Sequence, residues 1–339
     1  MKPDFVIRNA ASILLGQAEA LLPQLLEGER VVLVTDSEID RLYPALCNSY
    51  PKIVIGRGEG EKSLATVEQI HRMLIELGAD RKSFLLGVGG GIVTDVAGFA
   101  ASTYMRGIDF GFCSTTLLGQ VDASVGGKNG VNVGGYKNMA GTFNQPRFVV
   151  CDPAMLETLP DREFRAGLAE VVKAAVIGDA DLFAHLEQRS FEELRVDRQL
   201  MREVVRAAIA VKAAIVERDE REAGDRRLLN LGHTLAHAIE KCSAAMNHGE
   251  AVAVGLKLVT DMAVRIGYLA QGDGERILAL LERLGFCLEA PVPMADLLAE
   301  VGKDKKSAGD LIHLIVPRAI SSCEVMTLPK EEMKQLFGN

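Results

Sequence analysis

The chain has 339 residues, of which 48% are hydrophobic and 25% charged, and its formal net charge is −8. This length predicts about two domains with substantial cores, and the composition excludes both a disordered chain and a small scaffold held by disulfides. The acidic balance disfavours nucleic acid and anionic lipid as partners, so an anionic ligand would need a local basic pocket.

The first half of the chain alternates short apolar runs with helical patterns. Strands are expected at residues 31–35, 53–55, 84–88, 110–113 and 148–151, and helices at 63–78 and 92–101. Strands separated by helices predict βαβ units with a mainly parallel sheet, whose ligands gather at the carboxyl ends of the strands. We assign residues 1–152 to this domain.

From Pro153 onward the pattern becomes helical, and Asp152-Pro153 supplies a start signal for the first helix. Helices are expected at 161–177, 180–188, 197–222, 228–243, 249–267, 274–284 and 293–302, and residues 311–316 form the only strand pattern. The predicted fold class is therefore α/β plus all-α. An N-terminal Rossmann-like domain with a mainly parallel sheet precedes a mostly helical domain over residues 153–339.

The six cysteines are far apart and include no Cys-x-x-Cys pair. This spacing is typical neither of a disulfide framework nor of a cysteine zinc site, and it favours reduced thiols. The apolar patch from Ala10 to Leu15, interrupted by Ser12, is too short for a signal peptide, and no run is long enough for a transmembrane helix. We expect a cytoplasmic protein without membrane or nucleic-acid partners.

Glycines are concentrated in one segment, with 13 of the 33 between residues 87 and 135. The run LLGVGGG at 85–91 leads from a strand into a helix, where glycines let backbone N–H groups approach an anion such as a dinucleotide pyrophosphate. Because Ile92 breaks the G-x-G-x-x-G spacing, a tight structural turn is an equal alternative. Asp36, which closes the first strand, could accept ribose hydroxyls or simply begin a turn.

Three of the six histidines, His233, His237 and His248, lie within sixteen residues. His233 and His237 are four apart on a helical segment and share one face, and His248 precedes another helix. A carboxylate such as Glu170 would complete an open catalytic metal site with three protein ligands. The alternative is that these histidines cap helices or lie in a core, which is more usual for a single histidine than for three.

A group of cations stands in apolar or glycine-rich sequence, accompanied by two asparagines. Its members are Arg106, Lys128, Lys137, Asn138, Lys173, Lys212, Arg226 and Asn230. Such a group could hold a phosphate and a carboxylate. A solvated surface position is the alternative for each cation. It is weakest for Lys128 in the segment SVGGKNG and strongest for Lys212 on an amphipathic helix.

Seven segments of mixed chemistry follow one another between about residues 30 and 320. They are GEGEKS (58–63), GGGIVTDVAGFAASTYMRG (89–107), STTLLGQVDASVGGKNGVN (114–132), KNMAGTFNQP (137–146), LPDREFRAGLAEVVK (159–173), RRLLNLGHTLAHAIE (226–240) and HGEAVAVG (248–255). Together they resemble the 3-dehydroquinate synthase family.

The resemblance implies a bound NAD and a divalent metal, usually zinc, with cobalt as the alternative. The metal ligands would be Glu170, His233 and His248, which places His237 beside the substrate instead. The implied substrate is 3-deoxy-D-arabino-heptulosonate 7-phosphate, a phosphorylated keto-sugar acid of the shikimate pathway. Oxidation by NAD, elimination of phosphate, reduction, ring opening and an intramolecular aldol step would yield 3-dehydroquinate and regenerate NAD. The resemblance also implies a homodimer in which Arg106 reaches the neighbouring subunit's phosphate site.

The same resemblance assigns the remaining positions. The family's substrate-binding and catalytic positions match Asp122, Lys128, Asn138, Lys173, Lys212, Arg226, Asn230, His237 and Arg106, with one basic residue near the C-terminus, for which we favour Lys306 over Lys305. Its NAD-binding positions match Asp36, Glu59, Lys62, Gly89, Gly90, Gly91, Asp95, Thr115, Thr116, Asp122, Lys128 and Lys137.

Departures from the family pattern occur at Glu38, Thr94, Asn129 and residues 133–136. They bear on ribose contacts and loop geometry more than on the chemistry.

Another sugar phosphate cyclase and a metal-dependent dehydrogenase of the glycerol-phosphate type are the rival enzymes, and an inactive binding protein is a third alternative. Asn230 and His237 beside Arg226 favour the dehydroquinate enzyme, because cyclases acting on carboxylate-free sugars tend to change this group.

Overall fold

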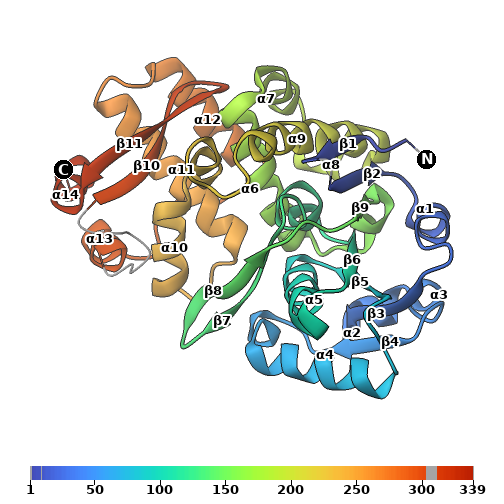
Figure 1. Ribbon diagram of the computed structural model, residues 1–339. Coiled ribbons are helices and arrows are strands. Elements are labelled where there is room, and N and C mark those ends of the chain that lie inside the picture. Colours follow the sequence, from blue (N-terminus) through green and yellow to red (C-terminus); the bar gives the residue numbers. More distant parts are fainter. Residues whose placement is uncertain (1, 9, 303–310, 339) are drawn as a thin grey trace. The chain divides into compact units, whose positions relative to one another are not determined.

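The computed structural model describes residues 2–8, 10–302 and 311–338, and the chain forms two compact units, Met1–Pro160 and Asp161–Asn339 (Figure 1). The units divide eight residues beyond the boundary expected from the sequence. Among the described residues, no helix is both long and apolar enough to cross a membrane.

The first unit is built on a seven-stranded sheet with the order β1-β2-β9-β6-β5-β3-β4. Its strands are β1 (Phe5–Ile7), β2 (Ala11–Leu15), β3 (Arg30–Asp36), β4 (Lys52–Ile55), β5 (Ser83–Gly89), β6 (Asp109–Ser114) and β9 (Phe148–Cys151). All neighbouring strands are parallel except β1, which runs antiparallel to β2. The mainly parallel sheet expected from the sequence is confirmed.

Helices and short turns connect these strands. They are α1 (Ala18–Leu25), α2 (Ser37–Leu42), α3 (Pro44–Cys47), η1 (Glu59–Glu61), α4 (Leu64–Glu76), α5 (Gly91–Thr103), η2 (Tyr104–Arg106), η3 (Gly119–Ala123, a π-helical turn) and η4 (Pro153–Thr158). The core contains Phe84, Leu86 and Val88 of β5 and Val150 of β9, all fully or nearly fully buried. Strands covered on both faces explain why their sequences are continuous apolar runs.

The features of this unit that were not expected from the sequence include one strand of the sheet and a separate hairpin. The apolar patch at Ala10–Leu15 contains β2, in which Ile13 and Leu14 are buried. The glycine-rich segment forms an antiparallel hairpin of β7 (Lys128–Val133) and β8 (Tyr136–Phe143) (Figure 1). Glycines and polar residues give this hairpin no apolar alternation, which is why the sequence pattern did not reveal it.

The second unit is mainly helical, as expected. Its elements are α6 (Asp161–Gly178), α7 (Ala180–Glu187), α8 (Phe191–Val196), α9 (Arg198–Arg218), η5 (Asp225–Asn230), α10 (His233–Cys242), α11 (His248–Arg265), α12 (Gln271–Arg283), α13 (Met294–Gly302), β10 (Leu311–Ala319), β11 (Ser322–Pro329) and α14 (Lys330–Phe337). The expectation of a single strand in this half was wrong, because β11 pairs with β10. Most of β11 is at least partly exposed and carries few large apolar residues, so its sequence resembles a loop.

Two helix starts also differ from the expectation. Asp152 begins η4 instead of α6, because its carboxylate accepts the backbone N–H of Ala154. The helix expected from residue 228 begins at His233, since Gly232 adopts a left-handed conformation with φ 76° and separates it from η5.

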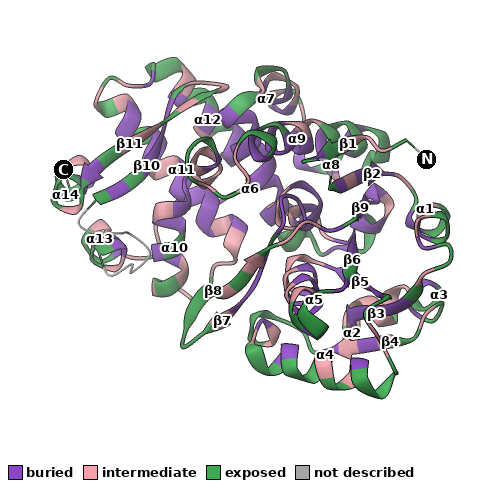
Figure 2. Cartoon of the chain, viewed as in Figure 1, coloured by how far each residue is buried: buried purple, intermediate pink, exposed green. Residues whose placement is uncertain are grey.

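The helix α6 lies at the centre of this unit and packs against α7, α9 and α11. Every residue from Ala166 to Ile177 is buried, as the purple ribbon of Figure 2 illustrates. A helix buried on all sides is normally apolar throughout. This one carries Glu170 and Lys173, so its two buried charges call for a partner or a ligand.

Candidate active site

Three helices of the second unit bring a carboxylate and two imidazoles together. Glu170 lies in the middle of α6, His233 is the first residue of α10, and His248 is the first residue of α11. The Nε2 atoms of His233 and His248 lie 3.4 and 3.3 Å from the same atom, Oε1 of Glu170. One ligand atom from each residue lies within 4.8 Å of the other two.

The other nitrogen of each imidazole is held by a second group. Nδ1 of His233 lies 3.1 Å from the carbonyl oxygen of Leu231, and Nδ1 of His248 lies 3.2 Å from Oε1 of Glu240. Acceptors at Nδ1 favour the tautomer that leaves Nε2 to act as a metal ligand, as in many metalloenzymes. Both Nε2 atoms are therefore oriented by groups outside the ligand set.

This donor set fits zinc. A tetrahedral zinc ion with bonds of about 2.0–2.1 Å has ligand-to-ligand edges of about 3.3–3.4 Å. The two nitrogen-to-oxygen separations, 3.3 and 3.4 Å, match that edge length. Nitrogen and oxygen donors suit zinc and cobalt alike, and three protein ligands leave a position open for substrate or water.

Charges around Glu170 keep it ionised. Burial alone would raise the pKa of Glu170, but the charge of Lys173, which pairs with Oε2, and the two histidines hold that pKa well below its usual value. Burial alone would lower the pKa of His248, but the hydrogen bonds that its imidazole donates to the carboxylates of Glu170 and Glu240 raise it to about 9. In the metal-free protein His248 therefore carries a proton that an incoming metal ion must displace.

Glycines allow the three helices to approach closely enough. A Cβ atom on Gly249, next to His248, would lie 2.2 Å from Cα of Ala166 on α6. A Cβ atom on Gly255 of α11 would lie 2.2 Å from the carbonyl oxygen of Gly232, the residue before α10. No side chain fits at either contact, so glycine is required for this packing.

The remaining candidates of this unit lie on neighbouring elements. Lys173, Lys212 and Arg226 are only 3, 7 and 3% exposed, so the solvated alternative for Lys212 is wrong. His237 lies on α10 with its ring centroid 5.6 Å from that of His233. Lys306 lies outside the described residues.

Arg226 and Asn230 are positioned by the loop between α9 and η5. The carboxylate of Asp219 accepts the backbone N–H groups of Gly224, Ala223 and Arg226, and these bonds hold the pKa of Asp219 below its usual value. Arg226 donates to the carbonyl oxygen of Glu220, and Asn230 donates to the carboxylate of Glu222.

Glu222 was missed in the sequence. It is one of several acids in the run ERDEREAGD, and nothing in that run distinguishes it. The structure singles it out through its contact with Asn230 and its left-handed φ of 61°.

In the first unit, several expected NAD-binding residues meet at one edge of the sheet. Asp36 ends β3, Gly89 ends β5, and Thr115 follows β6, on three adjacent parallel strands. The chain runs from β3 outward to β4 and then returns to β5 on the other side of β3. This reversal of strand order is the place where open α/β sheets bind ligands.

The turn between β5 and α5 depends on its glycines. Gly90 caps α5, and Cβ atoms on Gly89 and Gly90 would lie 2.5 Å from Val93 and 2.8 Å from Thr116. Gly89, Gly90 and Gly91 themselves carry no side chain, so the backbone N–H groups that begin α5 stand at the strand edge, an arrangement that suits a pyrophosphate. Thr116 accepts the N–H of Gly119, and the Thr115 hydroxyl is buried.

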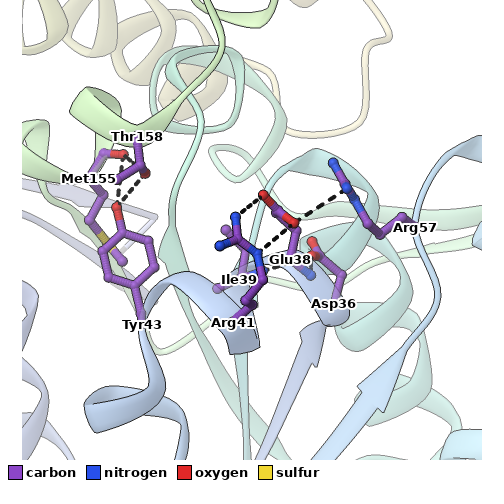
Figure 3. Close-up of polar contacts among 8 residues, drawn as sticks. All are labelled: Asp36, Glu38, Ile39, Arg41, Tyr43, Arg57, Met155 and Thr158. Atoms are coloured by element: carbon purple, nitrogen blue, oxygen red, sulfur yellow. Dashed lines mark hydrogen bonds and ion pairs between the residues drawn. The ribbon is translucent and has the colours of Figure 1, made fainter.

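Asp36 serves as a helix cap. Its Oδ1 atom accepts the N–H groups of Glu38 and Ile39 at 2.8 and 3.0 Å, which fixes the start of α2 (Figure 3). Both bonds use the same oxygen, so the capping role and ribose binding are compatible. Glu38 lies between Arg41 and Arg57, at 2.6 and 3.4 Å.

Other expected residues of this unit lie on η1, α5 and the hairpin. Lys62, 8% exposed, pairs with Asp95 of α5, and Glu59 belongs to η1. Asp122 lies in the π-helical turn η3. Lys128 begins β7, and Lys137 and Asn138 are exposed on β8. Arg106 is exposed at the end of η2.

Comparison with known proteins identifies the family. Sequence models of the N-terminal and C-terminal parts of 3-dehydroquinate synthase match residues 52–166 and 167–307. The 3-dehydroquinate synthase of Pelobacter propionicus is 41% identical over 320 residues, which cover 91% of this chain and 89% of the relative.

Two solved structures are similar over almost the whole chain. One is 2-epi-5-epi-valiolone synthase of Streptomyces hygroscopicus subsp. jinggangensis 5008 with NAD+ and Zn2+ bound (27% identity, TM-score 0.88, 98% of this chain and 97% of the other). The other is 2-deoxy-scyllo-inosose synthase with carbaglucose-6-phosphate, NAD+ and Co2+ (25% identity, TM-score 0.82, 96 and 95%). With both family models matched in order and the high identity to the Pelobacter enzyme, the chain belongs to the 3-dehydroquinate synthase family.

Proposed function

We propose that this chain converts 3-deoxy-D-arabino-heptulosonate 7-phosphate into 3-dehydroquinate and phosphate, with NAD and a divalent metal, zinc or cobalt, as cofactors. The observation that carries the proposal is the set of Glu170, His233 and His248, whose two nitrogen-to-oxygen separations match a tetrahedral zinc edge, in a member of this family. Asn230 and His237 favour this substrate over a carboxylate-free sugar.

The roles of the chain's residues follow from their chemistry. When bound, NAD supplies a hydride acceptor and the metal supplies a Lewis acid. Glu170, His233 and His248 would hold the metal, and the buried Lys173 keeps Glu170 ionised.

The cations would bind the two anionic ends of the substrate, with Lys128 in the phosphate site. Lys212 and Arg226 are desolvated, which strengthens their attraction for an anion. Much of the rate would come from the orientation they impose on the substrate.

We also propose a cytoplasmic homodimer in which Arg106 reaches the neighbouring subunit. Met105 and Arg106 both have positive φ, 49° and 72°, which is costly for non-glycine residues and is often kept at functional positions. This turn leaves Arg106 exposed, as a residue serving a neighbouring subunit must be.

A single incubation tests the activity. The purified protein is mixed with the heptulosonate phosphate, zinc and a trace of NAD, and we expect phosphate and dehydroquinate in equal amounts without net NADH. Accumulation of NADH would identify a dehydrogenase instead, and turnover of only a carboxylate-free sugar phosphate would identify another cyclase. Lys128→Ala should impair turnover while the chain stays folded, and wild-type kinetics in this variant would refute its phosphate role.

A further inference from the structure

The hairpin that carries Lys137 and Asn138 contains a bulge opposite Asn132. Val131 pairs with Ala140 and Val133 pairs with Tyr136. A single residue of β7, Asn132, therefore faces residues 137–139 of β8. Bulges interrupt the ladder of hydrogen bonds and redirect side chains, often beside active sites.

The side chain of Asn132 replaces a ladder partner in this bulge. Its Oδ1 atom accepts the backbone N–H of Asn138 at 2.9 Å. Asn138 has a φ of 54°, a left-handed conformation that costs energy even for asparagine and persists only where surrounding contacts fix it. The hydrogen bond from the Asn138 N–H to Oδ1 of Asn132 is such a contact.

The other end of the same amide reaches the nucleotide side of the unit. Nδ2 of Asn132 donates to Oε1 of Glu59 at 2.8 Å. The backbone N–H of Asn132 donates to the carbonyl oxygen of Lys62, also at 2.8 Å. Asn132 also forms a parallel bridge with Ser63. The orientation of the amide is unambiguous, because a backbone N–H can only donate and a carboxylate can only accept.

We propose that Asn132 is a positioning residue that couples NAD binding at Glu59 to the placement of Lys137 and Asn138 for the substrate. The proposal rests on the proposed function, in which Glu59 and Lys137 contact NAD and Asn138 contacts the substrate. One amide hydrogen-bonds to both segments, so ordering of Glu59 by NAD also restrains the bulge. Asn132 itself touches neither ligand in this scheme.

Amide hydrogen exchange tests the coupling without any turnover. In the wild-type protein, NAD should slow exchange at the backbone amide of Asn138. In Asn132→Ala the same amide should exchange faster, and NAD should no longer slow it. The proposal would be overturned if NAD left the exchange rate of the Asn138 amide unchanged in the wild type, or if NAD slowed this exchange equally in the wild type and in Asn132→Ala.

A charge-swapped pair tests the effect on catalysis. Asn132→Asp keeps the size of the side chain and the acceptor for Asn138, but sets a second carboxylate against Glu59. We expect kcat/KM to fall about 10- to 100-fold, the range for losing a hydrogen bond to a charged group, and NAD to bind more weakly. Adding Glu59→Gln restores a hydrogen bond at this contact, with the introduced glutamine amide as donor and the introduced aspartate carboxylate as acceptor. Because Glu59 also contacts NAD in this scheme, the rescue is measured without NAD: exchange at the Asn138 amide should be slower in the double variant than in Asn132→Asp alone.

Two results of this series would refute the coupling. One is Asn132→Asp with wild-type NAD affinity and kcat/KM, and the other is a double variant whose Asn138 amide exchanges as fast as in Asn132→Asp alone. Val133→Ala is the matched control, because the neighbouring Val133 side chain is 40% exposed and takes no part in the hydrogen bonds that join Glu59, Asn132 and Asn138. If the wild type produces no dehydroquinate, the proposed function fails, while the exchange experiment still decides on the coupling.

Discussion

Gly249 offers a direct test of how this fold builds its metal site. It follows His248 at the start of α11, and a Cβ atom there would lie 2.2 and 2.3 Å from Cα and the carbonyl oxygen of Ala166. Ala166 is one helical turn before Glu170 on α6. The contact therefore joins the two helices directly beside the ligands that each contributes.

The short distances at this contact set the expected effect of Gly249→Ala on stability and on zinc affinity. Ordinary van der Waals contact with a Cβ atom begins at 3.4 Å, so the two backbones must separate by about 1 Å. Metal sites tolerate deviations of about 0.2 Å in ligand distance. We expect Gly249→Ala to lower the free energy of unfolding by about 1–3 kcal/mol, as overpacking does, and to weaken zinc binding at least about tenfold.

Competition with a chromophoric chelator measures the zinc affinity, and urea unfolding of the metal-free protein measures the stability. Gly272→Ala is the control, because Gly272 lies in α12 and a Cβ atom there would meet no other atom within 4 Å. Its stability should stay level or rise by up to about 1 kcal/mol, with zinc affinity unchanged. Wild-type zinc affinity in Gly249→Ala would show that the close approach of α6 and α11 does not set the ligand geometry.

Three further predictions concern two charged groups of the metal site and one tight contact in the first unit. Glu240→Gln should weaken zinc binding about 10- to 100-fold because Nδ1 of His248 loses its anionic partner, and an unchanged dissociation constant would exclude that role. Zinc affinity should fall about tenfold for each unit that the pH drops below 9, because His248, with a pKa of about 9, must release its proton before it binds the metal. A zinc affinity that does not change with pH around neutrality would contradict this. Gly98→Ala should cost about 1–3 kcal/mol of stability, because its Cβ would lie 2.0 Å from Oδ1 of Asn129, and adding Asn129→Ala should recover part of that loss; strictly additive costs in urea unfolding would refute the clash.

Part of this architecture could be predicted from the sequence because the signals are local. The buried strands β3, β5, β6 and β9 are continuous apolar runs, and α6 and α11 follow long helical patterns. By contrast, β7 and β8 are held by cross-strand pairing and glycine contacts, and neither gives apolar alternation. Long-range pairing of this kind is invisible to local periodicity.

The candidate site likewise combines residues that local sequence patterns indicate with residues that only long-range contacts bring together. Spacing alone pairs His233 with His237, four residues on, whereas the imidazole that faces Glu170 together with His233 is that of His248 on another helix. Only the resemblance to a family suggested that set in advance. Glu222 and Asn132 had no signal in the sequence, because their importance lies in partners 8 and 73 residues away.

The two units are also continuous stretches of chain, and this has a consequence for synthesis. The nucleotide-side unit ends at Pro160, whereas the first metal-site residue is Glu170 and the last is His248. Domains generally fold as units in the order in which the ribosome releases them. We therefore expect the first unit to reach its native state while the second is still being translated, so that acquisition of the metal is a late event in the maturation of each new chain.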